Sequence, residues 1–311
     1  MKLLGTEQRN PQSLGLDRKS TLGILRLMNR EDARVATAVR AALPQIARAV
    51  DAIVRAFRQG GRLFYVGAGT SGRLAVLDAA ECPPTFGTPA SMVKAVIAGG
   101  RRAILRAVEG AEDSTARGAR DLAKAGLKRG DVVVGIAASG TTPYVLGALR
   151  LARRRGAATV GVTSNPRSPL AQLPQIPIMT ETGPEVLTGS TRLKAGTAQK
   201  MVLNMLSTAA MVRMGRIYEN QMAYLIATNE KLRRRSVRIL ADAAGASVST
   251  AKHALRQAGH DLPLALVMLK TGLSAANAQQ LLSEAAGNVR QAVETAGSRP
   301  RKQNRQAAKR N

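Results

Sequence analysis

The sequence predicts an α/β protein in which helices cover both faces of a parallel sheet, forming three layers. Short apolar runs alternate with segments of helical periodicity, the pattern expected when a helix connects each pair of parallel strands. Hydrophobic residues make up 45% of the 311 residues, enough to bury a large core. The predicted strands span 62–66, 93–97, 131–137, 158–164 and 176–180.

The chain before the first strand is predicted to be an arm followed by helices. Residues 1–20 are polar and are expected to form the arm. Apolar residues from Leu22 to Met28 have helical spacing, and a longer helix is expected from Pro44 to Gly60. Between the strands, helices are predicted at 71–80, 101–109, 115–125 and 142–155.

A long helix from Leu193 to about Tyr218 closes the predicted α/β domain, which spans residues 21–235. Its apolar residues are too abundant for a narrow amphipathic stripe, which indicates burial against a second subunit. A charged linker is expected at 231–235, followed by Ala-rich helices separated by glycines. We therefore predict a small all-helical appendage over 236–297 and a basic, disordered tail over 298–311.

The formal net charge of +27 raises the question of nucleic-acid binding. Outside the tail the positive charge is scattered over helical segments, and aromatic residues, which stack on single strands, are only 2% of the chain. We expect no specific nucleic-acid partner, but we expect nonspecific contact of polyanions with the basic tail.

The single cysteine, Cys82, excludes an internal disulfide and any metal site built from several cysteines. The sequence has no apolar run of 18 residues and no recognisable signal peptide. These features predict a cytoplasmic protein that does not insert into a membrane.

Two turns rich in glycine and hydroxyl groups follow predicted strands. The first, Gly67 to Arg73, opens a predicted helix, whose free N–H groups attract anions. Its glycines match the pattern G-x-G-x-x-G, but no acidic residue stands where a dinucleotide ribose would need one. The second turn spans Ala137 to Thr142. Because parallel strands end at one edge of the sheet, the two turns predict one phosphate-binding crevice.

Two carboxylates, Glu81 and Glu112, have surroundings that suit acid–base chemistry. Glu81 precedes a stiff Cys-Pro-Pro segment, and Glu112 lies in a small acidic island. Partial burial would raise the pKa of such a group and let it alternate between acid and base. From spacing alone, the favoured alternative is that Glu112 or Asp113 caps the helix near Ser114 and that Glu81 pairs with an arginine. Cys82 beside them is a nucleophile or, more commonly, a small hydrophobe.

The segment from Glu181 to Gly196 combines a Gly-Pro turn with acidic, hydroxyl and basic side chains at the start of a helix. That set suits a sugar phosphate, because cations and hydroxyls bind the ester and a carboxylate binds sugar hydroxyls. The alternative is an ordinary helix start, capped by Ser190 or Thr191, with Arg192 and Lys194 in solvent.

Five segments together resemble the N-acetylmuramic acid 6-phosphate etherases, a family built on the sugar isomerase (SIS) domain. The resemblance covers about residues 20–295, and its longest motif is 183–197. It implies a SIS domain with a small C-terminal ubiquitin-associated-like (UBA-like) helical appendage, a homodimer, and no metal or organic cofactor. The segments are 66–73, 79–87, 108–114, 135–145 and 185–204.

The activity implied by the resemblance is cleavage of the D-lactyl ether of N-acetylmuramic acid 6-phosphate, in the recycling of cell-wall sugar. The products are N-acetylglucosamine 6-phosphate and D-lactate. In this family the open-chain aldehyde acidifies the proton at sugar C2, lactate leaves C3, and water then adds. The resemblance assigns Glu81 as the proton donor and Glu112 as the second acid–base group.

The resemblance also implies which residues bind the substrate. Many relatives carry arginine where this chain has Thr141, so one fewer cation is expected near the phosphate. Glu185 and Lys194 are expected to be further substrate contacts. The expected phosphate ligands are the side chains of Thr70, Ser71, Ser139 and Thr142, with the backbones of Gly72 and Gly140.

Two other functions stay open at this point. One is a non-catalytic sugar-phosphate sensor like the glucokinase regulatory proteins, although those contain two copies of the domain and this chain has one. The other is an aldose–ketose isomerase, in which the Glu-Cys-Pro-Pro segment is not expected.

Overall fold

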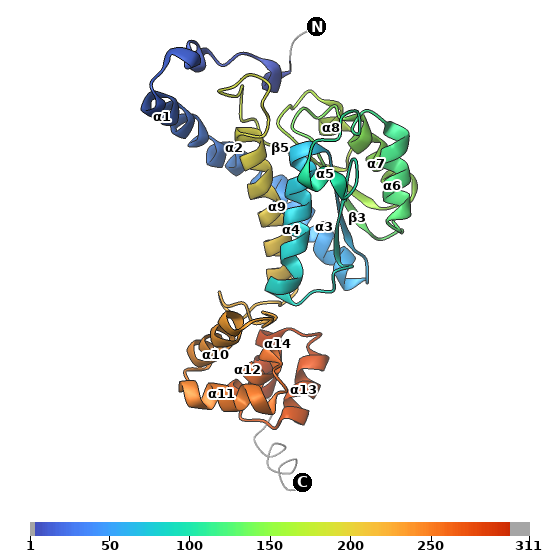
Figure 1. Ribbon diagram of the computed structural model, residues 1–311. Helices are drawn as coiled ribbons and strands as arrows, with labels where there is room; N and C mark the ends of the chain where they lie inside the picture. Colours follow the sequence, from blue (N-terminus) through green and yellow to red (C-terminus); the bar gives the residue numbers. More distant parts are fainter. Residues whose placement is uncertain (1–3, 299–311) are drawn as a thin grey trace. The chain divides into compact units, whose positions relative to one another are not determined.

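The computed structural model describes residues 4–298, so residues 299–311 of the expected tail at 298–311 lie outside the described residues. The chain divides into two compact units (Figure 1). Unit 1 comprises Met1–Ala80 and Pro89–Ala210, and unit 2 comprises Glu81–Thr88 and Met211–Asn311.

Unit 1 begins with an arm of short turns and continues into three helices. The arm contains the 3₁₀ turns Gly5–Glu7, Pro11–Ser13 and Leu16–Arg18. Ser20 starts the first helix, because its hydroxyl accepts a hydrogen bond from the N–H of Gly23 at 3.2 Å. The helices are α1 (Thr21–Asp32), α2 (Val35–Ala41) and α3 (Leu43–Arg58).

The five strands form one parallel sheet with the order β2-β1-β3-β4-β5. The chain runs from β1 to β2 on one side of the sheet and from β3 to β4 on the other side. Such a switch point between β1 and β3 leaves a crevice outside their carboxyl ends. Gly67 at the end of β1 pairs with Ile136 at the end of β3, so the two ends are level. The strands are β1 (Leu63–Gly67), β2 (Val93–Ile97), β3 (Val132–Ile136), β4 (Ala158–Thr163) and β5 (Ile176–Met179).

Helices cover both faces of this sheet, which confirms the predicted three layers. On one face, Phe64 and Val133 pack with α7 in a buried apolar cluster. On the other face, the Tyr65 hydroxyl donates to Asp78 of α4 at 2.9 Å, and Ser207 of α9 donates to the same carboxylate at 3.1 Å. The helices that follow strands are α4 (Gly69–Phe86), α5 (Arg102–Leu105), α6 (Thr115–Lys124), α7 (Pro143–Arg154), α8 (Pro169–Gln172) and α9 (Lys194–Arg213).

Helices α6 and α7 touch through their backbones at two glycines. A Cβ atom on Gly118 would lie 1.9 Å from the carbonyl oxygen of Tyr144, and one on Gly147 would lie 2.0 Å from that of Thr115. Side chains at these positions would force the helices apart. Because Gly118 and Gly147 have no side chains, α6 and α7 can approach this closely.

Helix α4 extends further than the sequence predicts. The expected end was near residue 80, before Pro83 and Pro84, but the helix continues through both prolines to Phe86. The proline rings hold φ near the helical value, and the cost is that the carbonyls of Ala79 and Ala80 have no backbone N–H four residues ahead. Glu81 therefore lies on a helix and not at its end. Helix α5, in contrast, is shorter than the predicted 101–109.

Unit 2 contains an all-helical domain, as expected, built around its own apolar cluster. The charged segment 231–235, expected to be a linker, lies inside α10 because Asn229 caps that helix and Glu230 pairs with Arg233 and Arg234. No helix in residues 4–298 is long and apolar enough to cross a membrane. The helices are α10 (Glu230–Ala244), α11 (Val248–Gln257), α12 (Leu262–Thr271), α13 (Ala275–Glu284) and α14 (Val289–Ser298).

Candidate functional site

The first glycine- and hydroxyl-rich turn packs tightly where β1 ends. A Cβ atom on Gly67 would lie 2.8 Å from the Gly72 nitrogen, and one on Gly72 would lie 2.6 Å from Ile97 Cγ1. Gly69, with φ +50, starts α4 directly after the strand. The N-terminal N–H groups of this 18-residue helix therefore lie at the carboxyl edge of the sheet, where a helix start favours an anion.

The start of helix α9 lies against the same turn. The buried Ser71 hydroxyl donates a hydrogen bond to Gln199 Oε1 at 2.9 Å. A Cβ atom on Gly196 would lie 3.5 Å from the methyl group of Thr70. The predicted phosphate turn and the 183–197 motif are thus neighbours in unit 1, although more than a hundred residues separate them in the sequence.

The second turn follows β3 and needs glycine at its centre. Gly140 has φ +71, and a Cβ atom there would lie 2.0 Å from Ser168 Oγ. Ser139 Oγ accepts hydrogen bonds from the N–H and the hydroxyl of Thr141 at 3.2 and 3.1 Å. Thr142 precedes α7, and its side chain forms no capping bond. Because β1 and β3 end level, the structure brings both predicted turns to one edge of the sheet.

Glu112 lies beside the second turn. Its carbonyl oxygen accepts a hydrogen bond from the N–H of Tyr144, in the first turn of α7, at 3.0 Å, and its side chain is exposed. The cap of α6 is Ser114, whose hydroxyl accepts from the N–H of Arg117 at 3.1 Å. The alternative that Glu112 or Asp113 supplies this cap is therefore wrong.

Glu81 lies in the segment Glu81–Thr88, which belongs to unit 2, whereas Glu112 belongs to unit 1. The side chain of Glu81 is exposed. The next residue, Cys82, is buried, as expected for a cysteine that packs as a small hydrophobe. The acid–base roles of the two carboxylates stay predictions at this point.

Glu185 is completely buried and caps helix α9. Its carboxylate accepts hydrogen bonds from the N–H groups of Lys194 and Ala195 at 3.1 and 2.9 Å. Burial raises the pKa of Glu185, and these N–H bonds and the Lys194 charge partly oppose that rise. The cap comes from nine residues before Lys194, so the alternative of a local cap by Ser190 or Thr191 is wrong.

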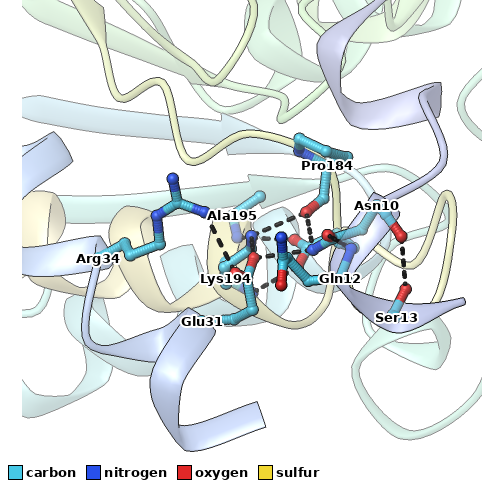
Figure 2. Close-up of polar contacts among 9 residues, drawn as sticks. Asn10, Gln12, Ser13, Glu31, Arg34, Pro184, Lys194 and Ala195 are labelled. Atoms are coloured by element: carbon cyan, nitrogen blue, oxygen red, sulfur yellow. Dashed lines mark hydrogen bonds and ion pairs between the residues drawn. The ribbon is translucent and has the colours of Figure 1, made fainter. Parts of the chain in front are cut away.

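Lys194 is buried and its ammonium donates to two neighbours, so the alternative that leaves it in solvent is wrong. Its ammonium lies 2.5 Å from Glu31 Oε2 and 2.7 Å from the carbonyl oxygen of Pro184 (Figure 2). Glu31 also accepts hydrogen bonds from Asn10 at 2.8 Å and from Arg34 at 3.1 Å. These bonds connect the residues on either side of the loop 186–193 to α1 and, through Asn10, to the N-terminal arm.

The charge on Glu31 is stabilised by its partners. Burial by itself would raise the pKa of Glu31, but the hydrogen bonds from Lys194 and Asn10 outweigh it and lower the pKa. Nothing in the sequence singles out Glu31, because a glutamate near the end of an exposed helix is usually solvated. Direct contact of Glu185 and Lys194 with a substrate stays a prediction.

Asp78 is a second carboxylate that the sequence analysis missed. It receives hydrogen bonds from Tyr65 and Ser207 and joins β1, α4 and α9 in unit 1. Burial raises its pKa to about 6, while the two hydroxyl groups oppose the rise. Among residues 4–298, no group of three or more His, Cys, Asp or Glu side chains could hold a metal ion.

The parallel sheet with two hydroxyl-rich turns at its switch point defines a protein of the SIS class. The SIS domain family matches residues 111–209, and the family described as "Glucokinase regulatory protein N-terminal SIS domain" matches residues 45–153. Among solved structures, a phosphoheptose isomerase from Francisella tularensis aligns with a TM-score of 0.48 and 19% identity, over 64% of this chain and 98% of that one.

Curated relatives define the family more narrowly. The chain is 56% identical over 289 residues to the "N-acetylmuramic acid 6-phosphate etherase" of Edwardsiella ictaluri, covering 93% of this chain and 96% of that protein. It is 54% identical over 288 residues to the protein of the same name from Yersinia pestis, covering 93% and 98%. This chain belongs to the N-acetylmuramic acid 6-phosphate etherase family.

Proposed function

We propose that this protein is a carbon–oxygen lyase that cleaves the D-lactyl ether of N-acetylmuramic acid 6-phosphate. The products are N-acetylglucosamine 6-phosphate and D-lactate. The observation that carries the proposal is the 56% identity to a curated etherase over nearly the whole length of both proteins. The two hydroxyl-rich turns at neighbouring strand ends support it, because they suit a phosphoester.

The proposed reaction needs two acid–base groups and no redox step. In the open-chain sugar the aldehyde acidifies the C2 proton, and a carboxylate removes it. The C3–O bond then breaks, and a second carboxyl group gives its proton to the departing lactate oxygen. Water adds to C3 of the unsaturated aldehyde, and a proton returns to C2. We assign Glu81 as the proton donor and Glu112 as the other acid–base group.

The proposed phosphate site relies on backbone and hydroxyl donors. The N-terminal N–H groups of α4 supply positive potential. Thr141 adds no cation to the second turn, so the helix N–H groups carry more of the binding in this proposal. The proposed ligands are Thr70, Ser71, Gly72, Ser139, Gly140 and Thr142, with Glu185 and Lys194 as further contacts.

The assembly and the location are also proposals. We infer a homodimer, the assembly that the resemblance to the etherases implies. Sedimentation of the purified protein tests this. We infer a cytoplasmic location and nonspecific polyanion contact through the basic tail.

The test of the reaction is release of D-lactate from N-acetylmuramic acid 6-phosphate by the purified protein. Glu81→Gln is expected to lower turnover by about 10²- to 10⁴-fold, the usual contribution of one acid–base group. Glu294→Gln is the matched control, because that carboxylate is exposed on α14 and is expected to leave turnover unchanged. Full activity of Glu81→Gln would exclude this residue from the mechanism. Binding of the sugar phosphate by the wild type without turnover would favour the sensor alternative.

A further inference from the structure

Gln199 is a buried polar side chain beside the proposed phosphate site that the proposed reaction does not use. It lies in the second turn of α9 and is 1% exposed. Its Oε1 accepts the hydrogen bond from the Ser71 hydroxyl at 2.9 Å. Its Nε2 is buried and has no hydrogen-bond partner among residues 4–298. A buried amide nitrogen without a partner is unfavourable, so this arrangement needs an explanation.

The direction of the Ser71 hydroxyl proton decides whether Ser71 can bind a phosphate. A serine hydroxyl has one proton to donate and two lone pairs to accept with. The oxygens of an ionised phosphate ester only accept hydrogen bonds. While the Ser71 hydroxyl donates to Gln199, its proton is not available to a phosphate. The free protein therefore holds a proposed phosphate ligand in an arrangement that does not bind phosphate through its hydroxyl.

A half-turn of the Gln199 amide removes this conflict, because it exchanges Oε1 and Nε2. The nitrogen then donates to Ser71 Oγ, and the Ser71 proton is free for a phosphate oxygen. The amide oxygen loses its donor, but an unpaired carbonyl oxygen is tolerated better than an unpaired N–H group. Without phosphate the original arrangement is favoured, since the Ser71 proton would otherwise have no acceptor.

We propose that Gln199 is a positioning residue that sets the direction of the Ser71 proton, toward the amide in the free protein and toward the phosphate in the complex. This inference rests on the proposed role of Ser71 in phosphate binding. It deepens that role, since it assigns the donor that makes the hydroxyl available to the ester.

Gln199→Glu tests the proposal, because a carboxylate has the same shape but accepts hydrogen bonds without donating them. The variant holds the Ser71 proton, so KM for the sugar phosphate is expected to rise by about 10- to 100-fold, the effect of losing one hydrogen bond to a charged group. The turnover number should change by less than about 3-fold, because the ester lies away from the reacting carbons. The inhibition constant of inorganic phosphate should rise in parallel with KM.

The pH dependence separates this role from a structural one. A protonated carboxyl group can donate to Ser71, so the ratio of the variant KM to the wild-type KM should fall as the pH is lowered. Taking the ratio at each pH removes the ionisation of the substrate phosphate. Gln199→Met neither holds the Ser71 proton nor donates to Ser71 Oγ, so its KM ratio should rise less than that of Gln199→Glu and should be independent of pH. It also serves if Gln199→Glu does not fold.

Two controls complete the experiment. Gln175→Glu makes the same substitution in a residue whose Oε1 already accepts from the Thr159 N–H at 3.0 Å, so KM should not change. In a Ser71→Ala background, Gln199→Glu should raise KM by less than about 2-fold. If Ser71→Ala leaves KM unchanged, the proposed role of Ser71 fails. If Ser71→Ala raises KM but Gln199→Glu does not, or does so independently of pH, the inference about Gln199 is overturned.

Discussion

Replacing Lys194 by methionine should strongly destabilise unit 1. The substitution keeps the volume of the side chain but removes the charge that lies 2.5 Å from Glu31. Both side chains are almost fully buried, 2% and 3% exposed, so Glu31 would keep a buried charge without its main partner. The substitution would also remove the hydrogen bond from Lys194 to the Pro184 carbonyl oxygen.

The expected loss follows from the remaining contacts of Glu31. Breaking a buried ion pair by removing one partner typically costs about 3–5 kcal/mol. Glu31 retains the hydrogen bonds from Asn10 and from Arg34, whose side chain is 67% exposed, so we expect a smaller loss, about 2–4 kcal/mol. Urea unfolding followed by far-ultraviolet circular dichroism measures it, which suits a chain without tryptophan.

The free energy of unfolding that Lys194→Met loses should also depend on pH. In the wild type the pKa of Glu31 is lowered, so its charged form stabilises the fold above the unfolded pKa near 4.5, and this stabilisation is lost as the pH falls. In Lys194→Met the charged form is unfavourable. The difference between the two proteins should therefore shrink at acidic pH. A loss below about 1 kcal/mol at neutral pH, or one that does not change with pH, would refute the role assigned to this pair.

A double variant separates stability from substrate binding. Glu31→Gln removes the charge that Lys194→Met leaves behind, so the two together should recover much of the free energy of unfolding. If the double variant is stable and KM is normal, Lys194 acts only in the fold. If it is stable and KM is raised, the predicted contact of Lys194 with the substrate gains support.

Two further predictions concern a turn and a buried acid. Gly140→Ala should lower the free energy of unfolding more than Gly130→Ala. Both residues have positive φ, but only at Gly140 would a Cβ atom clash, lying 2.0 Å from Ser168 Oγ. Equal losses of free energy in urea unfolding would contradict this clash. Asp78→Asn should flatten the pH dependence of the free energy of unfolding. Burial raises the pKa of Asp78 from 3.8 to about 6, so its protonated form stabilises the fold. In the wild type up to about 3 kcal/mol of this stability is lost as the pH rises from about 4 to 6, whereas the variant should not lose it. An unchanged slope would count against a raised pKa.

The sheet and its turns could be predicted because their signals are local. Each buried strand is a short apolar run, and Gly67 and Gly140 stand where the chain must turn sharply beside another backbone or side chain. The end of α4 could not be predicted in this way. Proline normally ends a helix, and nothing local indicates that Pro83 and Pro84 are tolerated in its last turns.

The ion pair beneath the 183–197 motif could not be predicted for a different reason. Glu31 and Lys194 are 163 residues apart, and spacing carries no information about such a contact. The carboxylate of Glu185 likewise caps a helix from nine residues before its first N–H, whereas known capping signals span about three. Residue types showed that the motif is charged, but only the fold shows which charges face each other.

The close approach of α6 and α7 has a consequence for substrate size. Glu112 is anchored to the first turn of α7 through Tyr144, and α7 begins at the turn that contains Ser139 and Thr142. The distance between the proposed phosphate ligands and Glu112, and with it the length of substrate that the proposed site admits, therefore depends on the close approach of α6 and α7. A methyl group added at Gly118 or Gly147 would lie 1.9 or 2.0 Å from a backbone carbonyl oxygen of the other helix and would push the two helices apart.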